Sequence, residues 1–317
     1  MEEGMEHSRV SVNGIKMHIV EKGKGPTVLL LHGFPQLWYS WRHQIHGLAA
    51  RGFRALAPDL RGFGDTDAPP STSSYTIYHI VGDLIALIDL LGQDKVFVVG
   101  HDWGAYVAWH LCLFRPDRVK ALLNLSVSFP RRSPVKPLDA IRSVYGDNYY
   151  ICRFQEPGVA EADFARVGTE RVLRIFFTLR HPGPLMVPED GFVAWPDKEP
   201  ALPSWMSEEE IRYYADKYEK TGFAGGLNYY RVLNLNWELM APWTGCQVKV
   251  PTKYIVGDQD LTYNSFRAKE YTHSDEFKKD VPLLQEVVVM RGVAHFINEE
   301  KSAEITDHIC DFFNRFI

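Results

Sequence analysis

The sequence predicts an α/β fold with a mostly parallel central sheet, flanked by helices and carrying an inserted helical cap, or lid. Continuous apolar runs that end in glycine, such as TVLLLHG and KVFVVG, are typical of strands buried on both faces of a parallel sheet. Stretches with apolar residues at helical spacing lie between these runs. The alternation stops after about residue 129 and resumes near residue 250, so the segment between is predicted to form the cap.

The predicted elements begin with a β-hairpin. Two alternating runs, RVSVN and IKMHIVEKG, meet at Asn13-Gly14, a pair typical of tight hairpin turns. The predicted buried strands then follow in the order TVLLL, FRALAPDL, KVFVV, VKALLNLSV, TKYIV and LQEVVVM. One intervening stretch has a clear apolar stripe of helical spacing. Its members are Ile77, Ile80, Val81, Leu84, Ile88 and Leu91.

The chain is predicted to divide into a core that is interrupted once. Residues 1–129 form the first part of the core, residues 130–247 the helical cap, and residues 248–317 the second part of the core. The predicted cap is rich in aromatic residues, proline and charge, as in DNYYICRFQEPG and GGLNYYRVLNLNWELMAPW, and its pattern is mainly helical.

Composition narrows the classes of function. The 317 residues are 45% hydrophobic and 24% charged, with a net charge of −5 and no polybasic stretch, which argues against a nucleic-acid or anionic-membrane partner. The start of the chain, MEEGMEHSRV, lacks the pattern of a signal peptide, and the four cysteines show no CxxC spacing, so a cytoplasmic protein is expected. A small neutral molecule is the expected substrate. No bound metal is expected, and the protein is expected to be a monomer or a dimer.

Candidate functional residues follow the strands, because ligands of open α/β sheets bind beyond the carboxyl ends of the strands. Four such ends carry HGFP at 32–35, GHDWG at 100–104, GDQD at 257–260 and RGVAHF at 291–296. A nucleophile, an acid and a histidine in this chain order are typical of α/β-hydrolases, in which the nucleophile is usually serine. Here Asp102 occupies the nucleophile position.

These phrases resemble those of the epoxide hydrolases of the α/β-hydrolase superfamily, particularly the plant soluble type. The resemblance covers nearly the whole chain and includes DLRGFGDTDAP and the cap phrases around Tyr150 and Tyr230. It implies an α/β-hydrolase core, a helical cap and hydration of epoxides without a cofactor, through an ester intermediate. The aromatic and leucine content of the cap predicts an apolar pocket for aryl or long-chain epoxides, and the resemblance implies fatty-acid epoxides as natural candidates.

The choice of nucleophile fits this chemistry. A serine that opened an epoxide would be left as a stable ether, whereas Asp102 would be left as an ester that water can hydrolyse. Aspartate is already ionised at neutral pH, so the histidine is free to serve the second step. We expect His295 to activate the hydrolytic water and Asp260 to orient and stabilise its imidazolium.

The remaining predicted roles surround the nucleophile. The backbone N–H groups of Phe34 and Trp103 are expected to form the oxyanion hole. Phe34, Pro35, Trp103 and Tyr149 are expected to contact the substrate. The resemblance also implies two cap tyrosines that donate protons to the epoxide oxygen.

The phrases NYYICRF and LNYYRVL give Tyr150 and Tyr230 for these two donors. Their immediate neighbours, Tyr149 and Tyr229, are the alternatives if the match is displaced by one residue. Asp258, in the same turn as Asp260, is likewise an alternative for the triad acid.

Two other functions share these features. A dehalogenase also uses an aspartate at this turn, and Trp103 could donate to a halide. The residue after His32-Gly33 is Phe34, however, where the haloalkane enzymes place asparagine, and Trp103 stands where fluoroacetate dehalogenases carry arginine. A non-catalytic receptor on the same fold would be expected to lose part of the catalytic set or to keep a serine.

Overall fold

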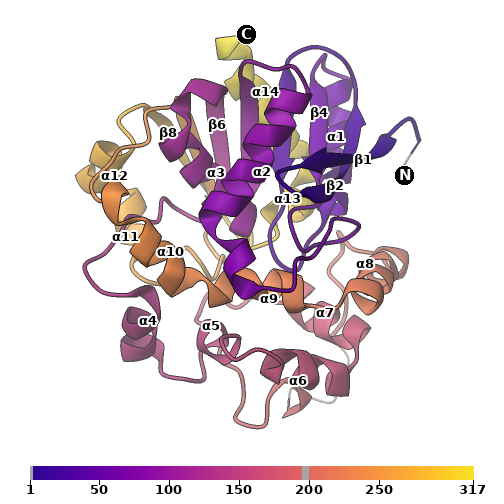
Figure 1. Cartoon of the computed structure of the whole chain (residues 1–317), viewed down its shortest axis with the longest axis vertical. Helices are drawn as coiled ribbons and strands as arrows, with labels where there is room; N and C mark the ends of the chain where they lie inside the picture. The colour runs from indigo at the N-terminus through magenta and orange to yellow at the C-terminus, as the bar shows by residue number, and fades with distance from the viewer. Residues whose placement is uncertain (1–2, 195–199) are drawn as a thin grey trace.

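The computed structural model describes residues 3–194 and 200–317, and it contains an eight-stranded sheet (Figure 1). The strand order is β1-β2-β4-β3-β5-β6-β7-β8; the first two strands run antiparallel, and the neighbours from β4 to β8 pair in parallel. The sheet confirms the predicted fold class. The strands are β1 (Glu6–Val12), β2 (Ile15–Lys22), β3 (Thr27–Leu31), β4 (Arg54–Pro58), β5 (Val96–His101), β6 (Val119–Leu125), β7 (Thr252–Gly257) and β8 (Leu284–Met290).

The predicted hairpin forms strands β1 and β2. Val12 pairs with Ile15, so the turn contains only Asn13 and Gly14. Both turn residues have positive φ, 43° and 82° respectively, as a turn of type I′ requires. Asparagine and glycine tolerate this conformation better than other residues, which explains why the hairpin is readable from the sequence.

Helices cover both faces of the sheet. Helix α2 packs against α3, and α1 packs against α14. In Figure 1, α2 and α3 lie in front of the sheet. The strands between these layers are almost entirely buried, as their continuous apolar runs predict. The helices outside the segment between β6 and β7 are α1 (Arg42–Ala49), α2 (Ile77–Leu90), α3 (Trp103–Phe114), α11 (Ala268–Thr272), α12 (Asp275–Asp280), α13 (Ile297–Glu300) and α14 (Ser302–Phe313).

The helices that the structure describes between β6 and β7 are joined by loops and gather at one end of the sheet (Figure 1). We call the segment between β6 and β7 the cap; the predicted bounds of the cap, residues 130–247, stay a prediction. The cap helices are α4 (Pro137–Tyr145), α5 (Tyr150–Arg153), α6 (Val159–Val167), α7 (Thr169–Phe177), α8 (Glu208–Thr221), α9 (Ala224–Arg231) and α10 (Leu233–Leu239). Short 3₁₀ turns are η1 (Trp38–Trp41), η2 (Thr72–Tyr75), η3 (Pro116–Arg118), η4 (Phe192–Ala194), η5 (Ala241–Trp243) and η6 (Asn314–Phe316).

Buried polar contacts seat the cap on the core. The guanidinium of Arg42 lies 2.7 Å from Glu210 of α8 and 2.7 Å from Glu299 of α13. All three side chains are buried, so the pairing of these charges offsets the cost of taking them out of water. The hydroxyl of Tyr229 on α9 also donates to the carbonyl oxygen of Arg61, at 2.9 Å. These contacts fix the position of α8 and α9 over the sheet edge.

Across the described residues, no helix is both long enough and apolar enough to cross a membrane. The cytoplasmic location stays a prediction.

Candidate active site

Asp102 occupies a sharp turn between β5 and α3. Its backbone has a φ of 53° and a ψ of −121°, a conformation that costs free energy in a residue with a side chain. Two glycines permit the turn. A Cβ on Gly100 would lie 2.6 Å from the Gly104 carbonyl oxygen, and a Cβ on Gly104 would lie 2.1 Å from the carbonyl oxygen of Leu31. The chain therefore presents the Asp102 carboxylate at the carboxyl edge of the sheet.

The HGFP loop closes against this carboxylate. The backbone N–H of Phe34 donates to Oδ1 of Asp102 at 2.7 Å. A Cβ on Gly33 would lie only 2.2 Å from the same oxygen, so the loop can approach this closely because residue 33 is glycine. The N–H of Phe34, one of the two predicted donors, therefore contacts Oδ1 of Asp102. It makes no contact with the other carboxylate oxygen, Oδ2. The second donor, the N–H of Trp103 at the start of α3, stays a prediction.

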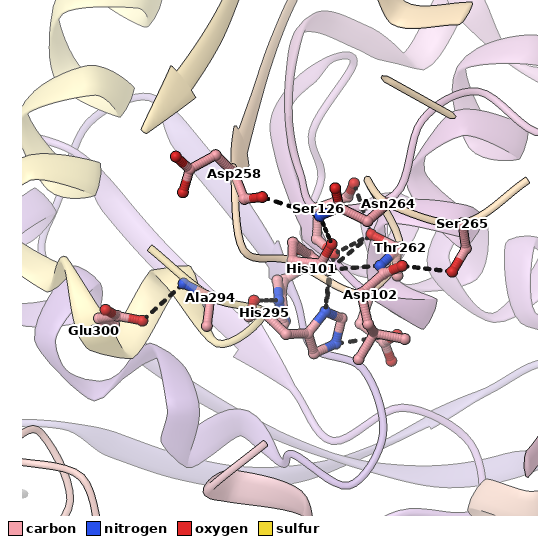
Figure 2. Close-up of polar contacts among 12 residues, drawn as sticks. His101, Asp102, Ser126, Asp258, Thr262, Asn264, Ser265, Ala294, His295 and Glu300 are labelled. Carbon is pink, nitrogen blue, oxygen red and sulfur yellow. Dashed lines mark hydrogen bonds and ion pairs between the residues drawn. The ribbon is translucent and has the colours of Figure 1, made fainter. Parts of the chain in front are cut away.

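His295 lies between two carboxylates. Its Nδ1 atom is 3.0 Å from Oδ1 of Asp260, and its Nε2 atom is 3.5 Å from Oδ2 of Asp102. Figure 2 shows the ring reaching toward Asp102 on one side and toward the end of β6 on the other. The structure therefore brings together the three residues that the sequence assigns to nucleophile, base and acid.

The two acidic residues of the GDQD turn have different environments. Oδ1 of Asp258 accepts from the backbone N–H of Gly292 at 2.8 Å and helps to hold the turn. Asp260 is fully buried beside His295, and its Oδ1 also accepts from the N–H and the hydroxyl of Thr262, at 2.8 and 2.9 Å. The geometry thus favours Asp260 over Asp258 as the partner of the histidine.

The charges of this triad stabilise one another. Burial opposes ionisation of Asp260, but the neighbouring His295 and the hydrogen bonds from its surroundings outweigh burial and lower the pKa of this carboxyl below its usual range. Burial also opposes protonation of His295, yet Asp260 and Asp102 together raise the pKa of the imidazole well above its usual range. Before substrate binds, His295 is therefore an imidazolium between two carboxylates.

Two hydroxyl groups that the sequence analysis did not single out also touch this triad. The Oγ atom of Ser126 lies 3.1 Å from Nδ1 of His295 and 3.1 Å from Oγ1 of Thr262 (Figure 2). Ser126 follows β6 directly and has a φ of 72°, which is unusual for a residue other than glycine. The predicted strand VKALLNLSV includes Ser126, whereas β6 ends at Leu125, so the rule that functional groups follow the strands selects Ser126 only once the true strand end is known.

Two further histidines, His32 of the HGFP loop and His101 beside the nucleophile, hold loops in place through hydrogen bonds. The side chain of His101 lies beneath the nucleophile, with Nε2 at 2.7 Å from the backbone oxygen of His295 and Nδ1 at 2.8 Å from Oε1 of Gln36. His32 accepts from the backbone N–H of Leu60 at 3.0 Å, through Nε2. Both rings are completely buried, so they hold the loops rather than face a substrate.

Two cavities meet at the nucleophile. The smaller, of about 30 Å³, is lined in part by Phe34 and Pro35, and the larger, of about 270 Å³, in part by Trp103 and Tyr149. All four predicted contact residues therefore border space beside the nucleophile. Four residues line both cavities: Asp102, Tyr150, Tyr230 and Leu261.

Tyr150 and Tyr230 face each other across this junction, with ring centroids 5.8 Å apart. Burial raises the pKa of both phenols well above the usual value, and the negative charge of Asp102 acts in the same direction. Both side chains are consequently protonated at neutral pH and can donate.

The neighbouring tyrosines are placed differently. Tyr229 donates its hydroxyl to the Arg61 carbonyl oxygen, away from the cavities. Tyr149 is buried and lines only the larger of the two cavities, where burial raises the pKa of its phenol above the usual range. The geometry favours Tyr150 and Tyr230 over their neighbours as the pair beside Asp102.

Comparison with known proteins defines the class. A family model described as the alpha/beta hydrolase fold matches residues 26–302, which is most of the chain. The helix-flanked parallel sheet and the turn that presents Asp102 are the features that this class shares.

Individual relatives define the family within that class. The chain is 61% identical to epoxide hydrolase 2 of Siraitia grosvenorii, over 99% of this chain and 100% of that protein, and 37% identical to epoxide hydrolase A of Mycobacterium tuberculosis, over 96% and 95%. Potato epoxide hydrolase I has a solved structure that is 56% identical, with a TM-score of 0.95 over 98% of this chain and 100% of that one. The chain belongs to the epoxide hydrolases.

Proposed function

We propose that this enzyme converts epoxides into vicinal diols through a covalent ester on Asp102. The observation that carries the proposal is the asymmetry of the Asp102 carboxylate. Oδ1 accepts from the Phe34 N–H, whereas Oδ2 points toward His295 and the cavities. A carboxylate held in this way can attack a ring carbon with Oδ2 and keep Oδ1 in place as the carbonyl oxygen of the ester.

In the first step, Oδ2 of Asp102 forms a bond to one ring carbon and the bond from that carbon to the epoxide oxygen breaks. Tyr150 or Tyr230 supplies a proton to the departing oxygen, because both line the cavities that meet at the nucleophile. The product of this step is a hydroxyalkyl ester of Asp102 and one ionised tyrosine.

Formation of the ester also prepares the base. Esterified Asp102 carries no negative charge, so one of the two carboxylates that hold the proton on His295 is lost. His295 can then donate its proton to the ionised tyrosine. The neutral imidazole that results can take a proton from water. Asp260 remains buried beside Nδ1 and stabilises the imidazolium that this transfer creates.

In the second step, the activated water attacks the ester carbon of Asp102. The negative charge that develops on Oδ1 is stabilised by the Phe34 N–H and, as we propose, by the Trp103 N–H. The bond between the carboxyl carbon of Asp102 and Oδ2 then breaks, so Oδ2 leaves with the substrate, and the new carboxylic acid gives its proton to this departing oxygen. This transfer releases the diol and restores both the Asp102 carboxylate and the imidazolium.

A single turnover in ¹⁸O-water, with enzyme in excess over styrene oxide, tests this sequence of steps. Because the oxygen of water enters the carboxyl group of Asp102, the first diol should be largely unlabelled and the peptide that contains Asp102 should carry the label. Labelled diol in the first turnover would show direct attack of water on the epoxide and would overturn the proposal.

We propose aryl and long-chain epoxides as the substrates, because the larger of the two cavities is lined mainly by apolar and aromatic side chains. Turnover of a panel of such epoxides, with analysis of the chirality of the diols, tests this assignment. Hydrolysis confined to short polar epoxides would contradict it.

A further inference from the structure

The cavity beside Asp102 continues away from the nucleophile. The larger cavity adjoins another of about 270 Å³, and the two share five lining residues. We call these two cavities together the tunnel. The shared residues are Tyr106, Pro130, Ile141, Leu233 and Phe266.

The tunnel changes character along its length. Its inner part, near Asp102, has mostly apolar and aromatic walls. Its outer part is lined by residues of α4 and α10 and by Arg131, Arg132 and Ser133. An apolar passage that begins at a nucleophile and ends at cationic side chains has the polarity of a long amphipathic molecule.

The cations near the outer end are not equivalent. Arg131 is exposed and pairs with Glu276 at 2.6 Å, and Lys136 pairs with Glu238 at 3.1 Å. Their charges are therefore compensated by neighbouring carboxylates. No carboxylate lies within ion-pairing distance of Arg132 in the parts of the chain that the structure describes, 3–194 and 200–317.

The guanidinium of Arg132 is held in position by neutral groups. Nε donates to the backbone oxygen of Trp237 at 2.8 Å, and Nη1 donates to Oγ1 of Thr244 at 3.2 Å. The guanidinium carbon also lies 4.1 Å from the centroid of the Trp237 ring. These contacts order the side chain without neutralising its charge, and within the described residues they occupy two of its five N–H donors, so three remain for another acceptor.

We propose that Arg132 binds the terminal carboxylate of an epoxide substrate whose apolar chain lies in the tunnel. This inference rests on the proposed function, because it assigns one end of the substrate that Asp102 attacks. An ordered guanidinium binds a carboxylate through charge-assisted hydrogen bonds, which are stronger than those between neutral groups. Since an ordered cation needs little reorganisation to bind, Arg132 would favour acids over the corresponding esters.

Anchoring of one end also has a consequence for the reaction. A chain fixed at Arg132 and extended through the tunnel can bring only a limited range of its carbon atoms to Asp102. Arg132 would therefore act as a specificity-determining residue. It would select epoxides at a restricted distance from the carboxylate and would not take part in the chemical steps.

The test compares Arg132→Met with the matched control Lys136→Met on three substrates, because Lys136 is a nearby cation that does not line the tunnel. These are an epoxidised long-chain fatty acid, its methyl ester, and styrene oxide, which is too short to reach from Asp102 to the tunnel's outer end. We expect Arg132→Met to raise KM for the acid by about 10-fold, the scale of a lost charge-assisted hydrogen bond. KM for the ester and for styrene oxide should stay within about 2-fold of the parent enzyme. Lys136→Met should leave all three values within that range.

Two further measurements sharpen the result. Arg132→Lys should recover part of the affinity for the acid, because it keeps the charge but loses the planar fork. Added salt should raise KM for the acid in the parent enzyme and have little effect on it in Arg132→Met. An equal effect of Arg132→Met on acid and ester, or an effect matched by Lys136→Met, would overturn the inference. Failure of the proposed function is distinguishable, because styrene oxide would then give no diol even with the parent enzyme.

Discussion

The Nε2 atom of His295 lies 3.5 Å from Oδ2 of Asp102, so the proposed base and the proposed nucleophile form an ion pair before substrate arrives. The buried imidazole has a raised pKa because Asp260 and Asp102 both hold its proton. The charge of Asp102 thus influences whether His295 is protonated. His295 stays protonated while Asp102 is free to attack, and it can lose the proton once Asp102 is an ester.

The first prediction concerns this coupling. Asp102→Asn, which resembles the neutral ester in charge, should lower the pKa of His295 relative to the parent enzyme. Imidazole ¹⁵N NMR as a function of pH, with the signal assigned through His295→Gln, measures the change. In single turnovers, hydrolysis of the ester should accelerate as pH rises and level off below the pH at which His295 titrates in the free enzyme. An unchanged titration in Asp102→Asn would contradict the coupling.

The second prediction separates the two chemical steps. His295→Gln should open one equivalent of epoxide and then stall, with hydrolysis slower by about 10²-fold or more because no base activates the water. Rapid-quench assays should show the burst, and intact-protein mass spectrometry should show the adduct. Asp102→Ala serves as the control and should give neither. Equal loss of the burst in both variants would mean that His295 is required for ring opening as well.

The third prediction concerns the cap tyrosines. Either Tyr150→Phe or Tyr230→Phe should slow formation of the ester while the remaining phenol still donates. The double variant should lose about 10²-fold or more, the usual range of general acid catalysis. Stopped-flow measurement of ester formation checks this, and circular dichroism reports on the fold.

Tyr229→Phe is the matched control for these variants, because the hydroxyl of Tyr229 is bonded to the Arg61 carbonyl oxygen. It should lower the free energy of unfolding by about 1 kcal/mol and leave the rate of ester formation nearly unchanged. If Tyr229→Phe slowed ring opening as much as Tyr230→Phe, the donor would have to be reassigned.

The fourth prediction assigns a positioning role to Ser126. Its hydroxyl lies beside Nδ1 of His295, so Ser126→Ala should slow hydrolysis of the ester by about 3- to 10-fold, the scale of one neutral hydrogen bond. Ser126→Gly should slow it equally, because the same hydroxyl is missing. It should unfold at a higher denaturant concentration than Ser126→Ala, since glycine accepts the φ of 72° without strain. Different hydrolysis rates for the two variants would point to a backbone effect instead.

The fifth prediction tests the close approach of the HGFP loop. Gly33→Ala would place a methyl carbon 2.2 Å from the present position of Oδ1 of Asp102, so either the loop or the carboxylate must move. We expect hydrolysis of the ester to fall by at least about 10²-fold, the scale of losing one oxyanion-hole donor. Gly14→Ala, which has open space around the added carbon, controls for a general effect of glycine replacement. Hydrolysis of the ester by Gly33→Ala at nearly the parent rate would show that the contact is dispensable.

The strands and the residues that follow them could be predicted from the sequence. Both depend on short local patterns, namely an apolar run and the few residues at its carboxyl end. For this reason Asp102, Asp260 and His295 were identifiable, although they lie far apart along the chain. Because the carboxyl ends of parallel strands meet at one edge of a sheet, these three residues could be expected to lie close together without any measured distance.

Contacts that depend on side-chain direction could not be predicted in the same way. Tyr229 and Tyr230 are adjacent in sequence, but successive residues on a helix point about 100° apart. One therefore bonds the Arg61 carbonyl oxygen and the other lines the cavities beside the nucleophile. The pairing of Arg42 with Glu210 and Glu299 joins three segments that are distant in sequence, so no local sequence pattern predicts it.

The position of the cap between β6 and β7 divides the proposed reaction between two stretches of chain. The phenols that assist ring opening belong to the inserted stretch, whereas the groups that break down the ester belong to the ends of the strands and the HGFP loop. Selection could therefore remodel the insertion, and with it the choice of epoxide, while the machinery that regenerates the enzyme stays intact. A lineage of such enzymes can diversify in what it consumes and still inherit one unchanged way of completing the cycle.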